Sequence, residues 1–391
     1  MIKIAVVVSH PIQHFCPMYS SWSKIDGIDL HVFFASSIGF KPYLDDAFGK
    51  KIAWQGLKLD FNHTFLNEGK ALPVSLKTDA PDLEEKLNAF RPDVIVNYGY
   101  RQKLQKRAFY YAIKKDIPIL MISDSELRRH RSLFKRALKK ITEPYYLSRV
   151  SGFLTVGDAN EAYYRNYGVP DYKFFRSPFP IDKNYMENFW VNRNHIKKEM
   201  RKFLKIPSDN IVILNVGKII RRKRQRDILE ALAMIDPKET PLSFIVVGSG
   251  PEEEALKTKS RSISDHQVIF TGFIQPMDLP KYYILSDIYV QPSEADPHPL
   301  AVSEAIYLGT PVVISHRCGS YGPTDDVREG VNGFVYRCGR VDELAHCIER
   351  LANDKFLREE FSEASRQIGL HAQELAHGQG LVNALRSLEL Y

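Results

Sequence analysis

Short apolar runs alternate with longer amphipathic segments along most of the chain, and this alternation restricts the fold more than any other feature of the sequence. Consecutive parallel strands need a crossover connection, usually a helix, so the pattern indicates a parallel sheet covered by helices on both faces. The strands expected in the first half are residues 2–8, 30–34, 94–96, 118–122 and 152–156. The helices expected between them are residues 82–90, 104–115, 132–147 and 158–167. Residues 41–76 fit neither pattern.

A second alternation follows a proline-bounded break at residues 177–182 and a polar stretch at 183–194. Its expected strands are residues 212–216, 242–247, 268–270, 288–291 and 311–315, and its expected helices are residues 224–235, 252–262, 277–285 and 299–308. We therefore predict an α/β protein with two Rossmann-like, doubly wound parallel-sheet domains that face a central cleft, where such folds bind ligands. The predicted domains are residues 1–182 and 183–365, followed by a helical tail, 366–391, that packs back on the first domain.

The composition agrees with two globular domains. A chain of 391 residues is long for a single core, and 44% hydrophobic with 26% charged residues is typical of globular proteins. No apolar run approaches the roughly 20 residues that a membrane-spanning helix needs. The four cysteines form no Cys-x-x-Cys pair, which favours free thiols in a reducing compartment. We therefore expect a soluble, cytoplasmic protein.

The net charge of +7 is concentrated in one region. Residues 101–149 contain fourteen Lys and Arg against four acidic residues. A basic face of this kind attracts anionic lipid headgroups or nucleic acid. Residues 127–141 mix cations with apolar side chains and could lie on the inner face of an anionic membrane, or could instead pack their apolar stripe on the sheet. The cations lack interleaved aromatic stacking residues, so we expect no nucleic-acid partner.

The segment 291–313 gives the strongest indication of chemistry. Pro299 suits the first position of a helix and Gly309 the residue after its end, so the helix should begin just after the loop that carries Asp296. Free backbone N–H groups near Leu300 and Ala301 would then point toward this loop and could hold a diphosphate.

Two carboxylates flank this helix start. Glu304 lies one turn into the helix and could accept two vicinal hydroxyls, as a ribose presents them, while Asp296 could bind hydroxyls of a sugar. The alternative is an exposed Asp and Glu beside an ordinary amphipathic helix. Residues 292–312 resemble the Glu-x7-Glu signature of the retaining glycosyltransferases of family 4, which have the GT-B fold, with Asp296 in place of the first Glu. The resemblance implies that Glu304 binds the ribose of a nucleotide-sugar donor.

Residues 215–229 resemble another segment of the same family, in which a strand, a Gly-Arg turn and a Lys-Gly pair precede a helix. Gly217 matches the turn, Lys218 stands where Arg is usual, and Arg224 replaces the Gly that follows Lys223. The resemblance implies that Lys218 and Lys223 bind the donor diphosphate, although a basic surface loop would look similar.

Two weaker matches lie between these segments. Gly248 begins a Gly-Ser-Gly-Pro turn that resembles the family's turn beside the nucleotide, although it is also a good turn in its own right. Phe273 and Ile274 resemble the segment whose backbone meets the nucleobase; the alternative is an ordinary strand end.

The first domain matches the family more loosely. His10 follows the first strand and could donate a hydrogen bond to phosphate or acceptor, or could simply open a helix. Asp124 or Glu126 follows another buried strand, where relatives place a His or an acid near the transferred sugar; Asp124 could equally be a helix cap.

No Asp-x-Asp sequence is present, so we expect no metal clamp on the diphosphate and no cofactor. Lys218, Lys223 and the helix start would neutralise the leaving group instead. These features predict a glycosyltransferase that moves a sugar from a UDP- or GDP-type donor to a saccharide or lipid-linked acceptor, and the resemblance implies that it retains the anomeric configuration. Two alternatives stay open: a sugar-nucleotide epimerase on the same fold, and a basic nucleic-acid-binding protein without enzymatic activity.

Overall fold

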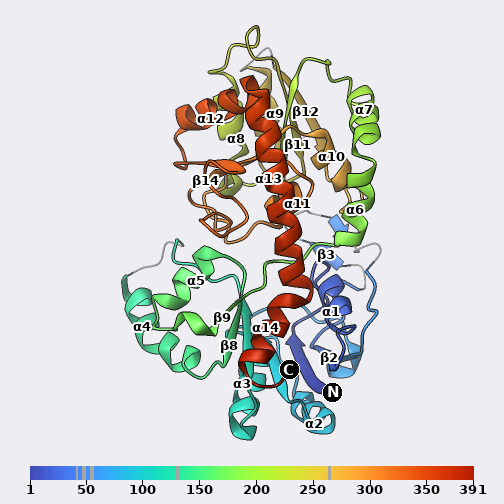
Figure 1. Cartoon of the computed structure of the whole chain (residues 1–391), viewed down its shortest axis with the longest axis vertical. Coiled ribbons are helices and arrows are strands. Elements are labelled where there is room, and N and C mark those ends of the chain that lie inside the picture. Colours follow the sequence, from blue (N-terminus) through green and yellow to red (C-terminus); the bar gives the residue numbers. More distant parts are fainter. Residues whose placement is uncertain (41–42, 46–49, 53–56, 129–132, 263–265) are drawn as a thin grey trace.

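The structure is a computed structural model that describes residues 1–40, 43–45, 50–52, 57–128, 133–262 and 266–391. Parts of the unassigned stretch 41–76 and of the basic region 101–149 therefore lie outside the described residues. The chain forms two lobes, each built around its own sheet, and both termini lie on the first lobe (Figure 1).

The first sheet has seven parallel strands in the order β5-β2-β1-β6-β7-β8-β9. They are β1 (Ile2–Val8), β2 (Ile28–Phe34), β5 (His63–Phe65), β6 (Val94–Tyr98), β7 (Ile119–Ser123), β8 (Gly152–Thr155) and β9 (Phe174–Arg176). The chain runs outward from β1 to β5 and returns to β6 beside β1, so the strand order reverses between β1 and β6. A separate antiparallel pair consists of β3 (Tyr43–Asp45) and β4 (Lys50–Ile52).

The second sheet has six parallel strands in the order β12-β11-β10-β13-β14-β15. They are β10 (Ile211–Val216), β11 (Leu242–Val247), β12 (Gln267–Gly272), β13 (Ile288–Gln291), β14 (Val312–Ser315) and β15 (Gly333–Tyr336). Here the order reverses between β10 and β13. A crevice opens at the carboxyl ends of the strands at such a point, and this is where open α/β sheets bind ligands.

Both sheets are buried on both faces, which explains why their strands read as continuous apolar runs. Alternate residues of β1 enter different cores: Ala5 and Val7 join one, while Val6 joins the other. In β10, Val212 packs into the core on one face of the second sheet and Ile213 into the core on the other face. Each domain is therefore a sheet between two helical layers.

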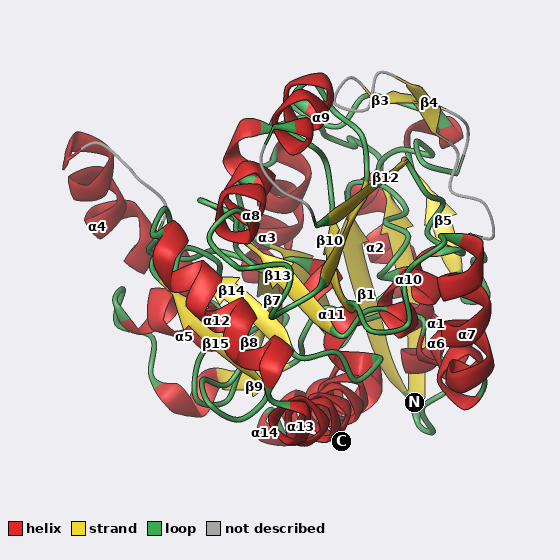
Figure 2. Ribbon diagram, turned by 90° about the horizontal axis from the view of Figure 1, so that it is seen from above, coloured by secondary structure: helices red, strands yellow, loops and turns green. Residues whose placement is uncertain are grey.

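The helices of the first half are α1 (Cys16–Trp22), α2 (Leu83–Phe90), α3 (Lys103–Lys115), α4 (Leu133–Leu147) and α5 (Asp158–Arg165). Those of the second half are α6 (Lys183–Val191), α7 (Arg193–Phe203), α8 (Gln225–Leu232), α9 (Glu253–Arg261), α10 (Leu279–Leu285), α11 (Leu300–Tyr307) and α12 (Val341–Asn353). One end of α4 projects from the body of the first lobe (Figure 2).

The last helices, α13 (Lys355–Glu374) and α14 (Gly380–Ser387), are joined by a short π-helical turn, and α13 runs along both lobes (Figure 1). Leu381 and Leu385 of α14 enter the core of the first domain. The indole N–H of Trp22 donates a hydrogen bond of 3.0 Å to the carbonyl of Ala376. The end of the chain is thus anchored on the domain with which the chain begins.

The prediction of two parallel-sheet α/β domains is confirmed. The polar stretch 183–194 is helical, and the Asp182 carboxylate caps α6 by accepting a hydrogen bond of 3.1 Å from the Tyr185 N–H. The domain limits at residues 182 and 365 stay a prediction. Within the described part of the chain, every helix is too short or too polar to cross a membrane.

Candidate functional site

Several residues predicted to bind a nucleotide sugar follow β10 and β13, the two strands at which the second sheet reverses its order. Gly217 comes directly after β10 and begins the loop that carries Lys218 and Lys223. Asp296 lies in the loop between β13 and α11. Because β10 and β13 are parallel neighbours, their carboxyl ends place both loops at one edge of the sheet.

Lys223 and Asp296 meet at this edge as an ion pair between Nζ and Oδ2. The same carboxylate oxygen accepts a hydrogen bond of 2.9 Å from the side-chain amide of Gln291, the last residue of β13. The Lys223 and Asp296 side chains are 17% and 15% exposed, so the pair is screened from most solvent but can still be reached by a ligand. An arriving phosphate would compete with Asp296 for the ammonium group.

Glu304 lies in the second turn of α11 and accepts a hydrogen bond of 2.7 Å from the Tyr283 hydroxyl. Burial raises the pKa of Glu304 from 4.5 to about 7, and the hydrogen bond from Tyr283 lowers it only in part. Pro299 is the N-cap residue of α11, and no side chain caps this helix. The backbone N–H groups of the first turn, at Leu300 and Ala301, therefore have no capping side chain as a hydrogen-bond acceptor.

Tyr289 of β13 lies between the contacts of Asp296 and those of Glu304. Its ring centroid lies 5.9 Å from that of Tyr283, and its hydroxyl donates a hydrogen bond of 2.8 Å to the Gln291 side chain. Burial raises the pKa of Tyr289 well above 10, and the charges of Asp296 and Glu304 raise it further. A continuous chain of side-chain contacts therefore connects the Lys223–Asp296 pair with Glu304.

Close backbone contact holds the glycine turns beside this region. The Gly217 N–H donates a hydrogen bond of 2.9 Å to the Val247 carbonyl. Gly248 has φ +137°, and a Cβ atom there would lie 1.9 Å from the Gly217 carbonyl oxygen, so only glycine fits. Phe273 and Ile274 follow β12 on the neighbouring strand end, and Ile274 packs against the core of the domain.

The loop that carries the two lysines has a tight backbone. The Gln225 side-chain amide donates a hydrogen bond of 3.0 Å to the Lys218 carbonyl. Arg224 has a left-handed backbone with φ +53°, a conformation in which glycine is favoured. This explains why the resembling family has glycine at that position. Here the Arg224 guanidinium binds the Asp227 carboxylate at 2.8 Å instead.

A pocket of about 210 Å³ lies on the first-domain side. Asp124 and Glu126 contribute to its wall, and Pro297, the neighbour of Asp296, closes it from the second domain. Asp124 is exposed, whereas Glu126 is 5% exposed and lies 3.7 Å from Arg128. Burial raises the pKa of Glu126, and Arg128 lowers it in part. Of the two acids predicted here, Glu126 is the buried one and has a cation nearby.

The floor of this pocket is aromatic and charged. The buried Glu143 pairs with Lys139 at 2.5 Å and accepts a hydrogen bond from the Tyr100 hydroxyl. The ring of Tyr100 stacks on Tyr146 at 4.1 Å. Flat rings and fixed carboxylates suit the apolar faces and the hydroxyls of a sugar.

His10 lies at the carboxyl end of β1, where its Nδ1 is 2.9 Å from the Ser9 hydroxyl. Burial lowers the pKa of His10 to about 4, so the imidazole is neutral at pH 7. It neighbours His14, which contacts Phe179 at 5.7 Å between ring centroids, and Phe179 contacts His298 at 5.2 Å. A row of rings therefore connects the loop of His10 with the loop of Asp296.

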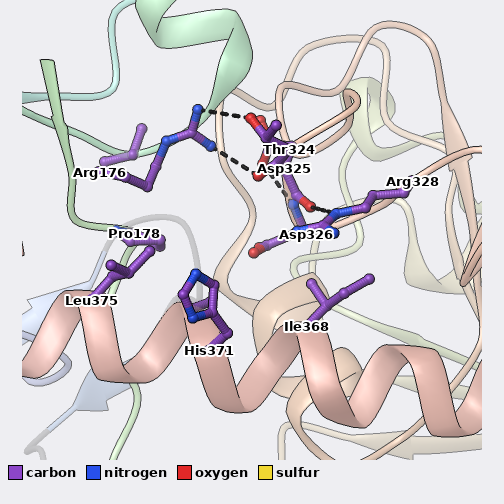
Figure 3. Close-up of a pocket in the computed structure, with 11 residues that line it drawn as sticks. Arg176, Pro178, Thr324, Asp325, Asp326, Arg328, Ile368, His371 and Leu375 are labelled. Carbon is purple, nitrogen blue, oxygen red and sulfur yellow. Dashed lines mark hydrogen bonds between the residues drawn. The ribbon is translucent and has the colours of Figure 1, made fainter. Parts of the chain in front are cut away.

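Direct polar contacts join the two domains around the site. Arg128 donates a hydrogen bond of 2.7 Å to the Cys318 carbonyl, and Arg317 donates one of 2.8 Å to the Arg128 carbonyl. Arg176 of β9 donates to the Thr324 carbonyl at 3.1 Å, as Figure 3 shows. The structure thus brings the first domain against the loops that carry the predicted donor residues.

Comparison with known proteins agrees with this arrangement. Residues 196–368 match the family described as glycosyl transferases group 1. A relative is the sulfoquinovosyl transferase SQD2 of Arabidopsis thaliana, 29% identical over 156 residues that cover 40% of this chain and 29% of that protein. The chain spans less than half the length of the curated relatives that it matches.

Solved structures show the same fold over the whole chain. A glycosyltransferase from Rickettsia africae ESF-5 has a TM-score of 0.72 at 14% identity and covers 100% of this chain and 99% of its own. Anabaena Alr3699/HepE, solved in complex with UDP and glucose, has a TM-score of 0.69 at 18% identity and covers 99% of this chain and 100% of its own. The fold is therefore GT-B, as predicted.

The fold is of the GT-B class, and the matched segment lies in the second half of the chain. More specifically, residues 196–368, which include the signature-like segment 292–312, match the group 1 glycosyl transferases.

Proposed function

We propose that this chain transfers a sugar from a UDP- or GDP-type nucleotide sugar to a saccharide or lipid-linked acceptor in the synthesis of a surface polysaccharide or glycoconjugate. The observation that carries the proposal is the Lys223–Asp296 pair at the strand reversal of the second sheet, connected through Gln291, Tyr289 and Tyr283 to Glu304 of α11, whose first turn has no side-chain cap. These groups supply a cation and free N–H groups for a diphosphate, and carboxylates for hydroxyls.

In this proposal Lys223 and Lys218 neutralise the diphosphate, Glu304 binds the ribose, and Asp296 binds the transferred sugar. Gly217 and Gly248 leave room for the backbone to approach the nucleotide, and Phe273 and Ile274 meet the base. Stabilising the charge that develops on the leaving diphosphate lowers the barrier to transfer. Protein cations fill this role, so the diphosphate needs no divalent metal.

The acceptor would enter the pocket between Asp124, Glu126 and Pro297. Its volume of about 210 Å³ and its lining of tyrosines and carboxylates fit one sugar ring. The acceptor hydroxyl would attack from the face that the diphosphate leaves, with a phosphate oxygen taking its proton, so the anomeric configuration is retained. We assign to Glu126, rather than to the exposed Asp124, a hydrogen bond to the reacting sugars, with the neutral His10 on the neighbouring loop.

A thermal-shift screen of the full chain against nucleotides and nucleotide sugars tests this function. A ligand at about 100 times its dissociation constant adds roughly 2.7 kcal/mol of stability. Stabilisation by a UDP- or GDP-sugar supports the proposal, and incubation of that donor alone, followed by NMR, separates transfer from epimerisation. A stability increase with RNA or DNA but with no nucleotide would overturn it in favour of nucleic-acid binding.

The pH dependence of donor binding follows from Glu304. Since its pKa of about 7 lies above the 4.5 of an unfolded carboxyl, the donor-free protein loses stability as the pH rises through this interval. Ribose hydroxyls bind the ionised form, so nucleotide binding should release a proton and weaken as the pH falls below about 7. Calorimetry in buffers of different ionisation enthalpy measures this proton. The same release in Glu304→Gln would contradict the assignment.

We also propose peripheral contact with an anionic membrane on the cytoplasmic side through α3 and α4. Apolar side chains that include Ile113, Leu138 and Ile141 are exposed on these helices, Ile141 to 76%, in a region rich in lysine and arginine. Such a surface binds anionic headgroups and the boundary of the acyl chains.

Ile141→Glu should therefore weaken binding to vesicles that contain phosphatidylglycerol by about tenfold in a flotation assay, with the exposed Phe203→Glu on α7 as the control. Equal binding by the two variants would speak against the assignment.

A further inference from the structure

Three buried side chains of the second domain, outside the proposed donor site, converge on one point. His298 lies between β13 and α11, and Asp325 and Asp326 lie between β14 and β15. One ligand atom from each lies within 4.8 Å of the other two. The side chains of His298 and Asp325 are 1% exposed and that of Asp326 is 5% exposed.

His298 has no ordinary hydrogen bond in this cluster. Both ring nitrogens are buried and lack a hydrogen-bond partner among the described residues. Its Nε2 lies 3.6 Å from Asp325 Oδ1 and 3.7 Å from Asp326 Oδ2, which is too long for hydrogen bonds. Metal–ligand bonds of about 2.0–2.2 Å at tetrahedral angles place neighbouring ligand atoms roughly 3.4 Å apart. The spacing therefore fits ligands around a shared cation.

Further contacts fix the two carboxylates in this orientation. Asp326 Oδ2 accepts a hydrogen bond of 2.6 Å from the Ser303 hydroxyl. Asp325 Oδ2 accepts one of 2.6 Å from the N–H of Asp158, the first residue of α5 in the other domain. Such outer contacts are typical of metal ligands, because they hold each ligand before the ion arrives.

A small pocket adjoins the two aspartates. It measures about 20 Å³ and is lined by Asp325, Asp326 and Arg176, as Figure 3 shows. This volume holds about one water molecule, which would complete four-fold coordination. Two neighbouring buried carboxylates need compensating positive charge. Arg176 supplies part of it, and a cation between the carboxylates and His298 would supply the rest.

We propose that His298, Asp325 and Asp326 bind a divalent transition-metal cation, with zinc or manganese fitting the mixed nitrogen and oxygen ligands. The ion would be structural: it would fix the loop of Asp296, two residues before His298, to the loop that contacts α5 of the first domain. It is separate from the diphosphate, where no metal is proposed. Sequence alone does not indicate this site, because His298 is far along the chain from the two aspartates and no short metal-binding spacing is present.

The test uses the full chain, freed of metal by a chelator and then given zinc or manganese alone. We expect one bound ion per chain, a higher melting temperature, and an X-ray absorption spectrum of one imidazole with oxygen ligands. Asp326→Asn and His298→Gln should weaken the metal affinity by more than about a hundredfold. His371→Gln, which changes an exposed histidine of the same pocket, is the matched control.

Two results would overturn the proposal. One is that the wild-type chain takes up no stoichiometric metal and melts at the same temperature with and without it, as expected if His298 holds only a proton. The other is that the bound metal shows ligands other than one imidazole and oxygen, or stays bound in both cluster variants, as expected for a surface site. The spectrum of the wild-type chain decides the matter even if a variant fails to fold.

Discussion

Lys223→Ala should reduce sugar transfer at least about a thousandfold while leaving the fold intact. The ammonium group that neutralises the leaving diphosphate is lost, and removing one such stabilising group costs about 10²–10³ in rate. The loss reaches the upper end of this range or beyond because the Asp296 carboxylate, which Lys223 contacts, is left without its cation. Steady-state kinetics with the donor identified by the thermal-shift screen measure the effect, and circular dichroism reports the fold.

Arg226→Ala is the control for this variant. Arg226 is the second residue of α8, close to Lys223 in sequence, but its side chain is 68% exposed and pairs with Glu230 on the helix surface. Loss of an exposed pair has little effect, so transfer should change less than about twofold. Full activity of Lys223→Ala, or equal losses in the two variants, would show that Lys223 does not neutralise the diphosphate.

Gly248→Ala should have the second largest effect, on both stability and nucleotide binding. The new Cβ would lie 1.9 Å from the Gly217 carbonyl oxygen, so the two turns beside the donor region must separate. A steric conflict combined with a left-handed backbone costs about 3 kcal/mol or more. Urea unfolding should show this loss, and nucleotide affinity should fall about a hundredfold because the displaced turns carry the donor residues.

Gly272→Ala separates the effect of the steric conflict from the effect of the left-handed backbone. Gly272 also has a left-handed backbone, with φ +70°, but a Cβ there has no heavy atom within 4 Å. Only the backbone preference is lost, at about 1–2 kcal/mol. Equal destabilisation by the two substitutions would mean that the contact between the Gly217 and Gly248 turns has no energetic role.

The sheets could be predicted from the sequence because their strands are buried on both faces. The run from Ile2 to Val8 is apolar at nearly every position, as expected of a central parallel strand that is covered by helices on both sides. The short β5 and β9 were not predicted, since each has three partly exposed residues. Helices α6 and α7 were not predicted because residues 183–203 bury little surface and so show no clear apolar stripe. Among these residues, Met186 is buried.

For the candidate site, the motifs predicted which residues bind the donor but not how these residues contact one another. Lys223 and Asp296 are far apart in the chain, so their ion pair depends on the pairing of β10 with β13. Gln291, which binds Asp296, could have been noticed as a polar residue at the end of an otherwise apolar strand. The choice between Asp124 and Glu126 as the acid near the sugar depends on how buried each side chain is. Sequence does not show this for two nearby residues of a loop.

The central claim is that one region of the second domain holds a diphosphate and the adjoining pentose together. The most direct test is calorimetric titration of wild type and Glu304→Gln with a nucleoside diphosphate and its 2′,3′-dideoxy analogue. We predict that wild type binds the analogue about ten- to a hundredfold more weakly than the nucleoside diphosphate. Glu304→Gln should bind both nucleotides equally, because the Glu304 carboxylate and the ribose hydroxyls stabilise the complex through their hydrogen bonds to each other. Unchanged discrimination against the analogue in Glu304→Gln would contradict the account.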